Sequence, residues 1–150
     1  MEKIAYCIFI ESLRKFTQFK IEKLKLFGEK TGMAFQIKDD LFDYGKEEIG
    51  KPTGNDIKEK KLTLPLIYTL NKIDAGKRRE MIYIIKNQNK VSQKIKIVLN
   101  AITDAGGIKY ATEKMYQYRD EALSVLYEFD DNQIRQGLEE LVRFTTDRKY

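Results

Sequence analysis

The chain has 150 residues, of which 42% are hydrophobic, so it can bury a core and is expected to form a single domain over residues 1–150. It has no histidine and one cysteine, which excludes histidine-based triads, histidine-ligated zinc sites and an internal disulfide. The net charge of +5 comes from residues of both signs, so it does not distinguish a phosphorylated ligand from a nucleic acid or a membrane surface.

The N-terminal region up to about Tyr44 has helical periodicity and predicts one or two long helices. Its apolar run at residues 4–10 is much shorter than the roughly 20 residues that cross a bilayer, so no stable membrane span is expected. Cys7 lies in this run and is expected to be a buried, inert thiol. This thiol favours a reducing compartment, and we expect the protein to be cytoplasmic.

An acidic cluster lies near the end of this region. On a helix that turns roughly 100° per residue, four polar side chains share one edge: Gln36, Asp39, Asp40 and Asp43. The other positions are mostly apolar and are expected to form the buried face: Ala34, Phe35, Ile37, Leu41 and Phe42. No lysine or arginine is expected among the acids, and Gly45 is expected to end the helix.

This arrangement of acids is costly without a cation. Like charges three or four residues apart repel by about a few tenths of a kcal/mol per pair, and the helix C-terminus adds a further penalty. A solvated acidic face could absorb these costs. A divalent cation would remove them, and carboxylate oxygens are ligands suited to Mg²⁺.

A glycine-broken loop follows the acids. From Gly45 to Lys61 there is no apolar periodicity, and the loop contains five lysines: Lys46, Lys51, Lys58, Lys60 and Lys61. A solvated surface loop is one interpretation and a functional loop is the other. Beside the acidic cluster, the loop predicts a site in which a metal on the helix and the lysines together hold a diphosphate.

The rest of the chain predicts further helices and no strands, so the fold class is all-α. Thr63 is expected to cap a short helix with Pro65 in its first turn, and Ile82, Ile84 and Ile85 mark a second helix. Gly106 and Gly107 separate two more helices. Candidate N-caps for a last helix are Asp130, Asp131 and Asn132. Apolar stripes mark these three helices: Val91, Ile95, Val98, Leu99 and Ile102, then Ile108, Ala111, Met115, Tyr118, Ala122 and Leu126, then Ile134, Leu138, Leu141, Val142 and Thr145.

Three segments in order resemble the second aspartate-rich region of the trans-isoprenyl diphosphate synthases, or polyprenyl synthetases. These segments are Gly-Met-Ala-Phe-Gln-Ile-Lys-Asp-Asp-Leu-Phe-Asp at 32–43, Gly-Lys-Pro-Thr-Gly-Asn-Asp at 50–56, and Lys-Leu-Thr-Leu-Pro-Leu at 61–66. The resemblance runs from about Leu24 to the C-terminus. It implies the isoprenoid-synthase type of helical bundle, of which this chain would be the C-terminal half.

The resemblance also implies an activity and its residues. It implies a prenyltransferase that condenses an allylic prenyl diphosphate with isopentenyl diphosphate with the help of Mg²⁺. Carried over by motif, the residues divide into four groups: Asp39, Asp40 and Asp43 on the metal, Lys51 and Lys61 on the diphosphate, Asp56 behind the metal, and Phe35 and Gln36 at the reacting end of the prenyl chain.

The departures from the family pattern bear on activity. Family members are about twice as long, and their first aspartate motif and isopentenyl diphosphate site have no counterpart here. We therefore expect the isolated chain to be inactive or nearly so, and to form a homodimer or pair with a missing N-terminal half. A non-catalytic helical interaction module or partner subunit is the alternative. A nucleic-acid binder is not expected, because the lysines are dispersed among acids and form no recognised motif.

Overall fold

The computed structural model describes residues 2–45 and 54–148, and within these ranges the chain forms helices and no strands. The all-α prediction is confirmed. The helices are α1 (Glu2–Phe42), α2 (Asn55–Lys58), α3 (Leu64–Lys72), α4 (Ala75–Asn87), α5 (Ser92–Asp104), α6 (Gly107–Leu126) and α7 (Gln133–Asp147).

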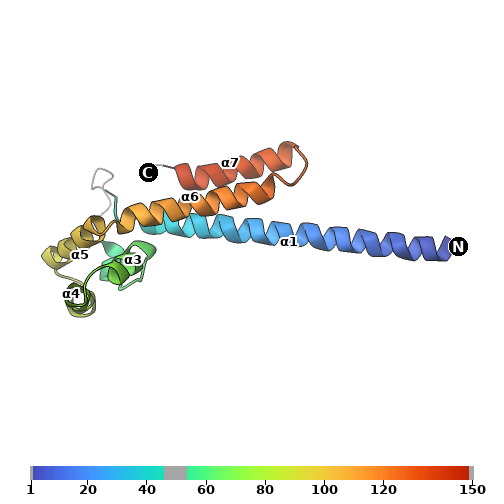
Figure 1. The fold of residues 1–150 in the computed structure, drawn as a ribbon. Helices are drawn as coiled ribbons and strands as arrows, with labels where there is room; N and C mark the ends of the chain where they lie inside the picture. The colour runs from blue at the N-terminus through green and yellow to red at the C-terminus, as the bar shows by residue number, and fades with distance from the viewer. Residues whose placement is uncertain (1, 46–53, 149–150) are drawn as a thin grey trace.

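The helices fall into two groups (Figure 1). Helices α1, α6 and α7 run side by side as a long layer, while α3, α4 and α5 gather at the end of that layer where α1 finishes. The N-terminal half of α1 continues well beyond the other helices. The two groups meet through α3, which packs against α6.

Helix α1 is one continuous helix of 41 residues. Phe27, Ala34 and Ile37 are buried in its C-terminal half, where α1 packs against α6. The half that extends past α6 is different, because its described large apolar side chains are exposed: Leu13, Phe16, Phe19 and Ile21. Leu24 and Leu26, near the end of α6, are exposed as well. In the part of the chain that the structure describes, no helix is both long enough and apolar enough to cross a membrane.

Helices α2 to α5 enclose a separate hydrophobic core. Its buried residues are Ile57, Leu66, Met81, Ile84, Ile85, Ile95, Val98 and Ile102. Asp74 caps α4, because its Oδ1 accepts hydrogen bonds from the N–H groups of Gly76 and Lys77 at 2.9 and 3.0 Å. Thr63 precedes α3 as expected, but its hydroxyl contacts the Tyr44 hydroxyl instead of capping the helix.

Glycine allows α3 and α6 to approach closely. A Cβ atom at Gly107 would lie 2.6 Å from the Pro65 carbonyl oxygen and 2.6 Å from Thr69 Oγ1, so only glycine fits at this crossing. Gly106, with φ of 79°, turns the chain into α6 in a left-handed conformation. The predicted junction therefore needs glycine at both positions, for the backbone conformation of Gly106 and for the close helix crossing at Gly107.

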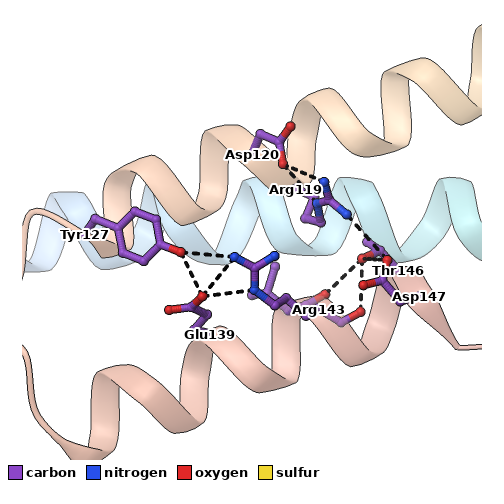
Figure 2. A network of polar contacts seen from close by, with 8 residues as sticks. Arg119, Asp120, Tyr127, Glu139, Arg143, Thr146 and Asp147 are labelled. Atoms are coloured by element: carbon purple, nitrogen blue, oxygen red, sulfur yellow. Dashed lines mark hydrogen bonds and ion pairs between the residues drawn. The ribbon is translucent and has the colours of Figure 1, made fainter.

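Helix α7 is held on α6 by a polar network (Figure 2). The Tyr127 hydroxyl donates to Glu139 Oε1 at 2.8 Å, and Arg143 Nε donates to the same oxygen at 2.9 Å. At the other end of α7, Arg119 Nη1 on α6 lies 3.4 Å from Asp147 Oδ1. These contacts tie the middle and the C-terminal end of α7 to α6.

Only part of the predicted apolar stripe of α7 is buried. Val142 and Thr146 face the core, and Asn132 caps the helix by accepting a hydrogen bond from the Arg135 N–H at 3.0 Å. Ile134 is 77% exposed and Leu141 is 53% exposed, so these two residues of the stripe lie on the surface.

Candidate functional site

The last turns of α1 carry the acidic cluster where the two groups of helices meet. The helix ends at Phe42, slightly before the predicted Gly45, and Asp43 begins the turn that follows. Gln36 Nε2 lies 3.4 Å from Asp40 Oδ1, as expected for residues four apart on one helical edge. The Tyr44 hydroxyl beside them contacts Thr63, and burial raises the pKa of Tyr44 to about 12.

Asp43 joins α1 to α2. Its Oδ1 accepts a hydrogen bond from the Asn55 N–H at 2.8 Å, and its Oδ2 accepts one from the Asp56 N–H at 3.0 Å. The Asp43 carbonyl oxygen also accepts from the Gly54 N–H at 3.1 Å. Burial nevertheless raises the pKa of Asp43, although the two N–H donors act in the opposite direction.

Asp40 lies half-buried between α1 and the start of α3. Burial raises its pKa, and the negative charges of Asp56 and Asp39 act in the same direction. Hydrogen bonds from Gln36 and the Leu64 backbone lower the pKa, but not enough to offset burial. An ionised Asp40 is therefore costly in this position unless positive charge is brought to it.

Asp39 has a partner that the sequence did not suggest. Its Oδ1 accepts a hydrogen bond from Arg148 Nη2, at the C-terminal end of α7, 109 positions away in the chain. The expectation that no cation lies among the acids is wrong for this residue. Sequence spacing carries no signal for such a contact, because it depends on how α7 packs.

Phe35 and Gln36 lie on the surface of α1. Phe35 is not on the buried face, contrary to expectation; its ring faces the Arg148 guanidinium, whose central carbon is 4.8 Å from the ring centroid. Both residues are therefore close to the acids, on the exposed side of the helix.

Lys61 and Asp56 form an ion pair in the turn after α2. Lys61 Nζ lies 3.1 Å from Asp56 Oδ1 and 2.7 Å from Glu59 Oε2. These two acids raise the pKa of Lys61, so it stays charged at any physiological pH. Lys61 is 59% exposed and Asp56 only 15%, so the lysine can reach a ligand while the aspartate holds it. Lys51 lies outside the described residues.

The donor set matches a hard cation in its chemistry. Asp39, Asp40 and Asp43 offer carboxylate oxygens, which Mg²⁺ prefers, and two of them are partly desolvated. In the described part of the chain, however, no three such side chains converge as a ready metal site. Asp39 turns to Arg148 and Asp43 to the α2 backbone. A cation would have to draw the acids together.

Comparison with known proteins identifies the family. Residues 5–102 match the sequence profile described as Polyprenyl synthetase. The chain belongs to the polyprenyl synthetase family. Among curated relatives of the family, solanesyl diphosphate synthase 1 of Arabidopsis thaliana is 32% identical over 129 residues, which are 85% of this chain and 30% of that protein.

Solved structures of polyprenyl synthetases share the fold. The geranylgeranyl pyrophosphate synthase of Bacteroides thetaiotaomicron has a TM-score of 0.76 and 37% identity, over 85% of this chain and 42% of that one. The Corynebacterium glutamicum geranylgeranyl pyrophosphate synthase, in complex with isoprenyl diphosphate and magnesium, has a TM-score of 0.72 and 29% identity, over 86% and 38%. The isoprenoid-synthase type of fold is thereby confirmed, and the chain spans well under half of each protein named here.

Proposed function

We propose that this chain forms the second aspartate-rich, diphosphate-binding part of a prenyltransferase that condenses an allylic prenyl diphosphate with isopentenyl diphosphate. The observation that carries the proposal is the pair of half-buried acids, Asp40 and Asp43, on the same side of the bundle as the Asp56–Lys61 ion pair. Membership of the polyprenyl synthetase family supports the same reaction class.

The acids would hold Mg²⁺. Burial makes the charges on Asp40 and Asp43 costly, and a cation shared with Asp39 offsets that cost. Bound there, Mg²⁺ supplies the positive charge that stabilises a departing diphosphate. Asp43 accepts hydrogen bonds from two N–H groups of α2, and it would keep these as support while one of its oxygens turns to the metal.

The lysines would bind the diphosphate oxygens. Lys61 keeps its charge and is exposed enough to reach a ligand, while Asp56 orients it. Lys51 is proposed for the same ligand on the resemblance of its segment. Phe35 and Gln36 lie next to the acids and would face the reacting end of the prenyl chain, where a ring face and an amide oxygen favour positive charge.

We further propose that the 150 residues alone do not turn over substrate. They span 30% of the solanesyl diphosphate synthase and 42% of the Bacteroides synthase named above. The exposed apolar side chains on α1, such as Phe16 and Leu13, suit burial against a second polypeptide. That polypeptide would be one carrying the first aspartate motif, or a second copy of the chain. We also propose a single all-α domain and a reducing, cytoplasmic location.

The test combines binding and turnover. Pyrophosphate binding to the 150-residue chain is measured by calorimetry with and without Mg²⁺, for the wild type and for Asp39→Asn and Lys61→Ala. We expect Mg²⁺-dependent binding that both substitutions weaken by tenfold or more. Binding that does not depend on Mg²⁺ or on Asp39 would refute the proposed site. Turnover of an allylic diphosphate and isopentenyl diphosphate by the chain alone, at the rate of a complete synthase, would refute the proposed incompleteness.

A second candidate is a non-catalytic interaction module. It is favoured by the exposed apolar residues on α7, Ile134, Leu141 and Phe144, together with those on α1. Sedimentation of the chain with and without Mg²⁺ and a prenyl diphosphate separates the two candidates. Tight self-association without ligand binding supports the module, whereas ligand binding through Asp39 supports the synthase site.

A further inference from the structure

Arg148 is bound to Asp39, a carboxylate that the proposed function assigns to the metal. Its Nη2 donates to Asp39 Oδ1, and the contact is partly shielded, since the Arg148 side chain is 20% exposed and that of Asp39 is 38% exposed. A divalent cation bound to Asp39 would lie close to this guanidinium, and the two positive charges would repel each other. Arg148 and a metal therefore compete for Asp39.

Two aromatic rings of α1 form the surface on which the guanidinium lies. Its central carbon is 4.8 Å from the centroid of Phe35 and 5.3 Å from that of Phe42. Phe35, Asp39 and Phe42 lie on successive turns of one helical face. Cation–π attraction to both rings can keep the guanidinium at this face when its ion pair with Asp39 is broken.

Helix α7 delivers Arg148 from a fixed support. The Arg148 N–H bonds to the Phe144 carbonyl oxygen at 3.1 Å, which closes the last turn of α7. The preceding residue, Asp147, is bound to Arg119 of α6 (Figure 2). The backbone at Arg148 is thus held, and a rotation of its long side chain is enough to move the charged group.

The charged groups around the guanidinium favour its moving away from Asp39 when a cation binds there. Lys38 lies on the neighbouring edge of α1, where burial lowers its pKa and Arg148 lowers it further, while Asp147 acts in the opposite direction. Among the described residues, Lys38 and Asp147 therefore lie close to the Arg148–Asp39 pair. A divalent cation on Asp39 adds positive charge that repels the guanidinium, and an anionic ligand beside the cation attracts it.

We infer that Arg148 neutralises Asp39 while no metal is bound and transfers to the diphosphate when a divalent cation takes that carboxylate. This inference rests on the proposed function. The guanidinium is suited to both positions, because its donors match a carboxylate and a phosphate equally well. Arg148 is therefore a residue that positions Asp39 in one state and binds ligand in the other.

The inference predicts effects of opposite sign in one variant. Free Mn²⁺ is measured by electron paramagnetic resonance during titration of the wild type and Arg148→Ala. We expect the variant to bind Mn²⁺ alone about three to ten times more tightly, because the competing cation is gone. With Mn²⁺ saturating, we expect the same variant to bind inorganic pyrophosphate about ten times more weakly.

Arg143→Ala is the matched control. Arg143 is also on α7, but it binds Glu139 and Tyr127 and not the acids of α1, so its removal should change neither affinity. Circular dichroism of each variant checks that helix content is unchanged. Arg148→Lys should recover less than half of the pyrophosphate affinity, because lysine lacks the planar fork of donors.

The outcomes separate this inference from the proposed function. If wild-type pyrophosphate binding requires Mn²⁺ and Asp39 but Arg148→Ala changes neither affinity, the exchange is refuted and the site stands. If Arg148→Ala weakens both affinities, Arg148 acts only as support and the exchange is again refuted. If Asp39→Asn binds Mn²⁺ and pyrophosphate as the wild type does, both the site and the exchange fail.

Discussion

Two glycine-to-alanine substitutions in helices should change stability in opposite directions. Gly107 begins α6 where that helix crosses α3, and a Cβ atom there would lie 2.6 Å from a backbone oxygen of Pro65. Backbone cannot move as cheaply as the end of a side chain, so the two helices must separate. Overpacking of this kind costs about 1 to 3 kcal/mol. We expect Gly107→Ala to lower the free energy of unfolding by that amount.

Gly137 provides the control with the same chemical change. It lies inside α7, and a Cβ atom there would meet no other atom within 4 Å. Alanine is favoured over glycine in a helix interior by about 0.5 to 1 kcal/mol, so Gly137→Ala should stabilise the chain. The two variants should thus differ by about 1.5 to 4 kcal/mol, the sum of the two effects.

Urea unfolding followed by circular dichroism measures both variants under one condition. For a chain of this length, each kcal/mol should also shift the melting temperature by about 2 to 4 °C. A neutral or stabilising effect of Gly107→Ala, of the kind expected for Gly137→Ala, would show that α3 and α6 do not approach as closely as the structure has them. The packing of α3 against α6, which joins the two groups of helices, would then have to be revised.

Three further predictions concern the site and its supports. Gly54 has φ of 80°, and a Cβ atom there would lie 2.6 Å from Ile95 Cγ2, so Gly54→Ala should cost about 1 to 3 kcal/mol in urea unfolding. Asn132→Ala should cost about 1 kcal/mol and speed hydrogen exchange at the Arg135 amide, which loses its capping partner. Burial raises the pKa of Asp40 in the folded chain, so the folded state binds this proton more tightly than the unfolded state, and the group destabilises the fold as pH rises through its titration. The stability of Asp40→Asn relative to the wild type should therefore increase between pH 4 and pH 7; a constant difference would contradict the assigned burial.

The sequence predicted most of the features that depend on local spacing. Helix periodicity, the Gly106-Gly107 junction and the Asn132 cap each follow from residues within one or two turns of one another, and the structure agrees. The contact between Gln36 and Asp40 follows in the same way, because a helix fixes the angle between residues four apart. Asp43 lies beyond the end of α1, so helical spacing does not fix its direction.

Features that depend on packing between distant segments could not be predicted. The Arg148–Asp39 contact joins residues 109 positions apart, and periodicity within α1 gives no information about the end of α7. The same limit applies to Ile134 and Leu141, which are exposed, because an apolar stripe predicts a face but not the rotation at which neighbouring helices cover it. The roles proposed for Lys61 and Asp56 came from resemblance, and their ion pair appears only in the folded chain.

The described residues form three buried hydrophobic cores, and the proposed ligand groups are divided between two of them. Asp39 and Asp40 extend from α1, which packs on α6, whereas Lys61 follows α2, whose Ile57 belongs to the core of α2 to α5. A metal–diphosphate complex bound by all of these residues would link the core of α2 to α5 with the core between α1 and α6. Its binding should therefore slow amide exchange in both cores together, including helices that never touch the ligand.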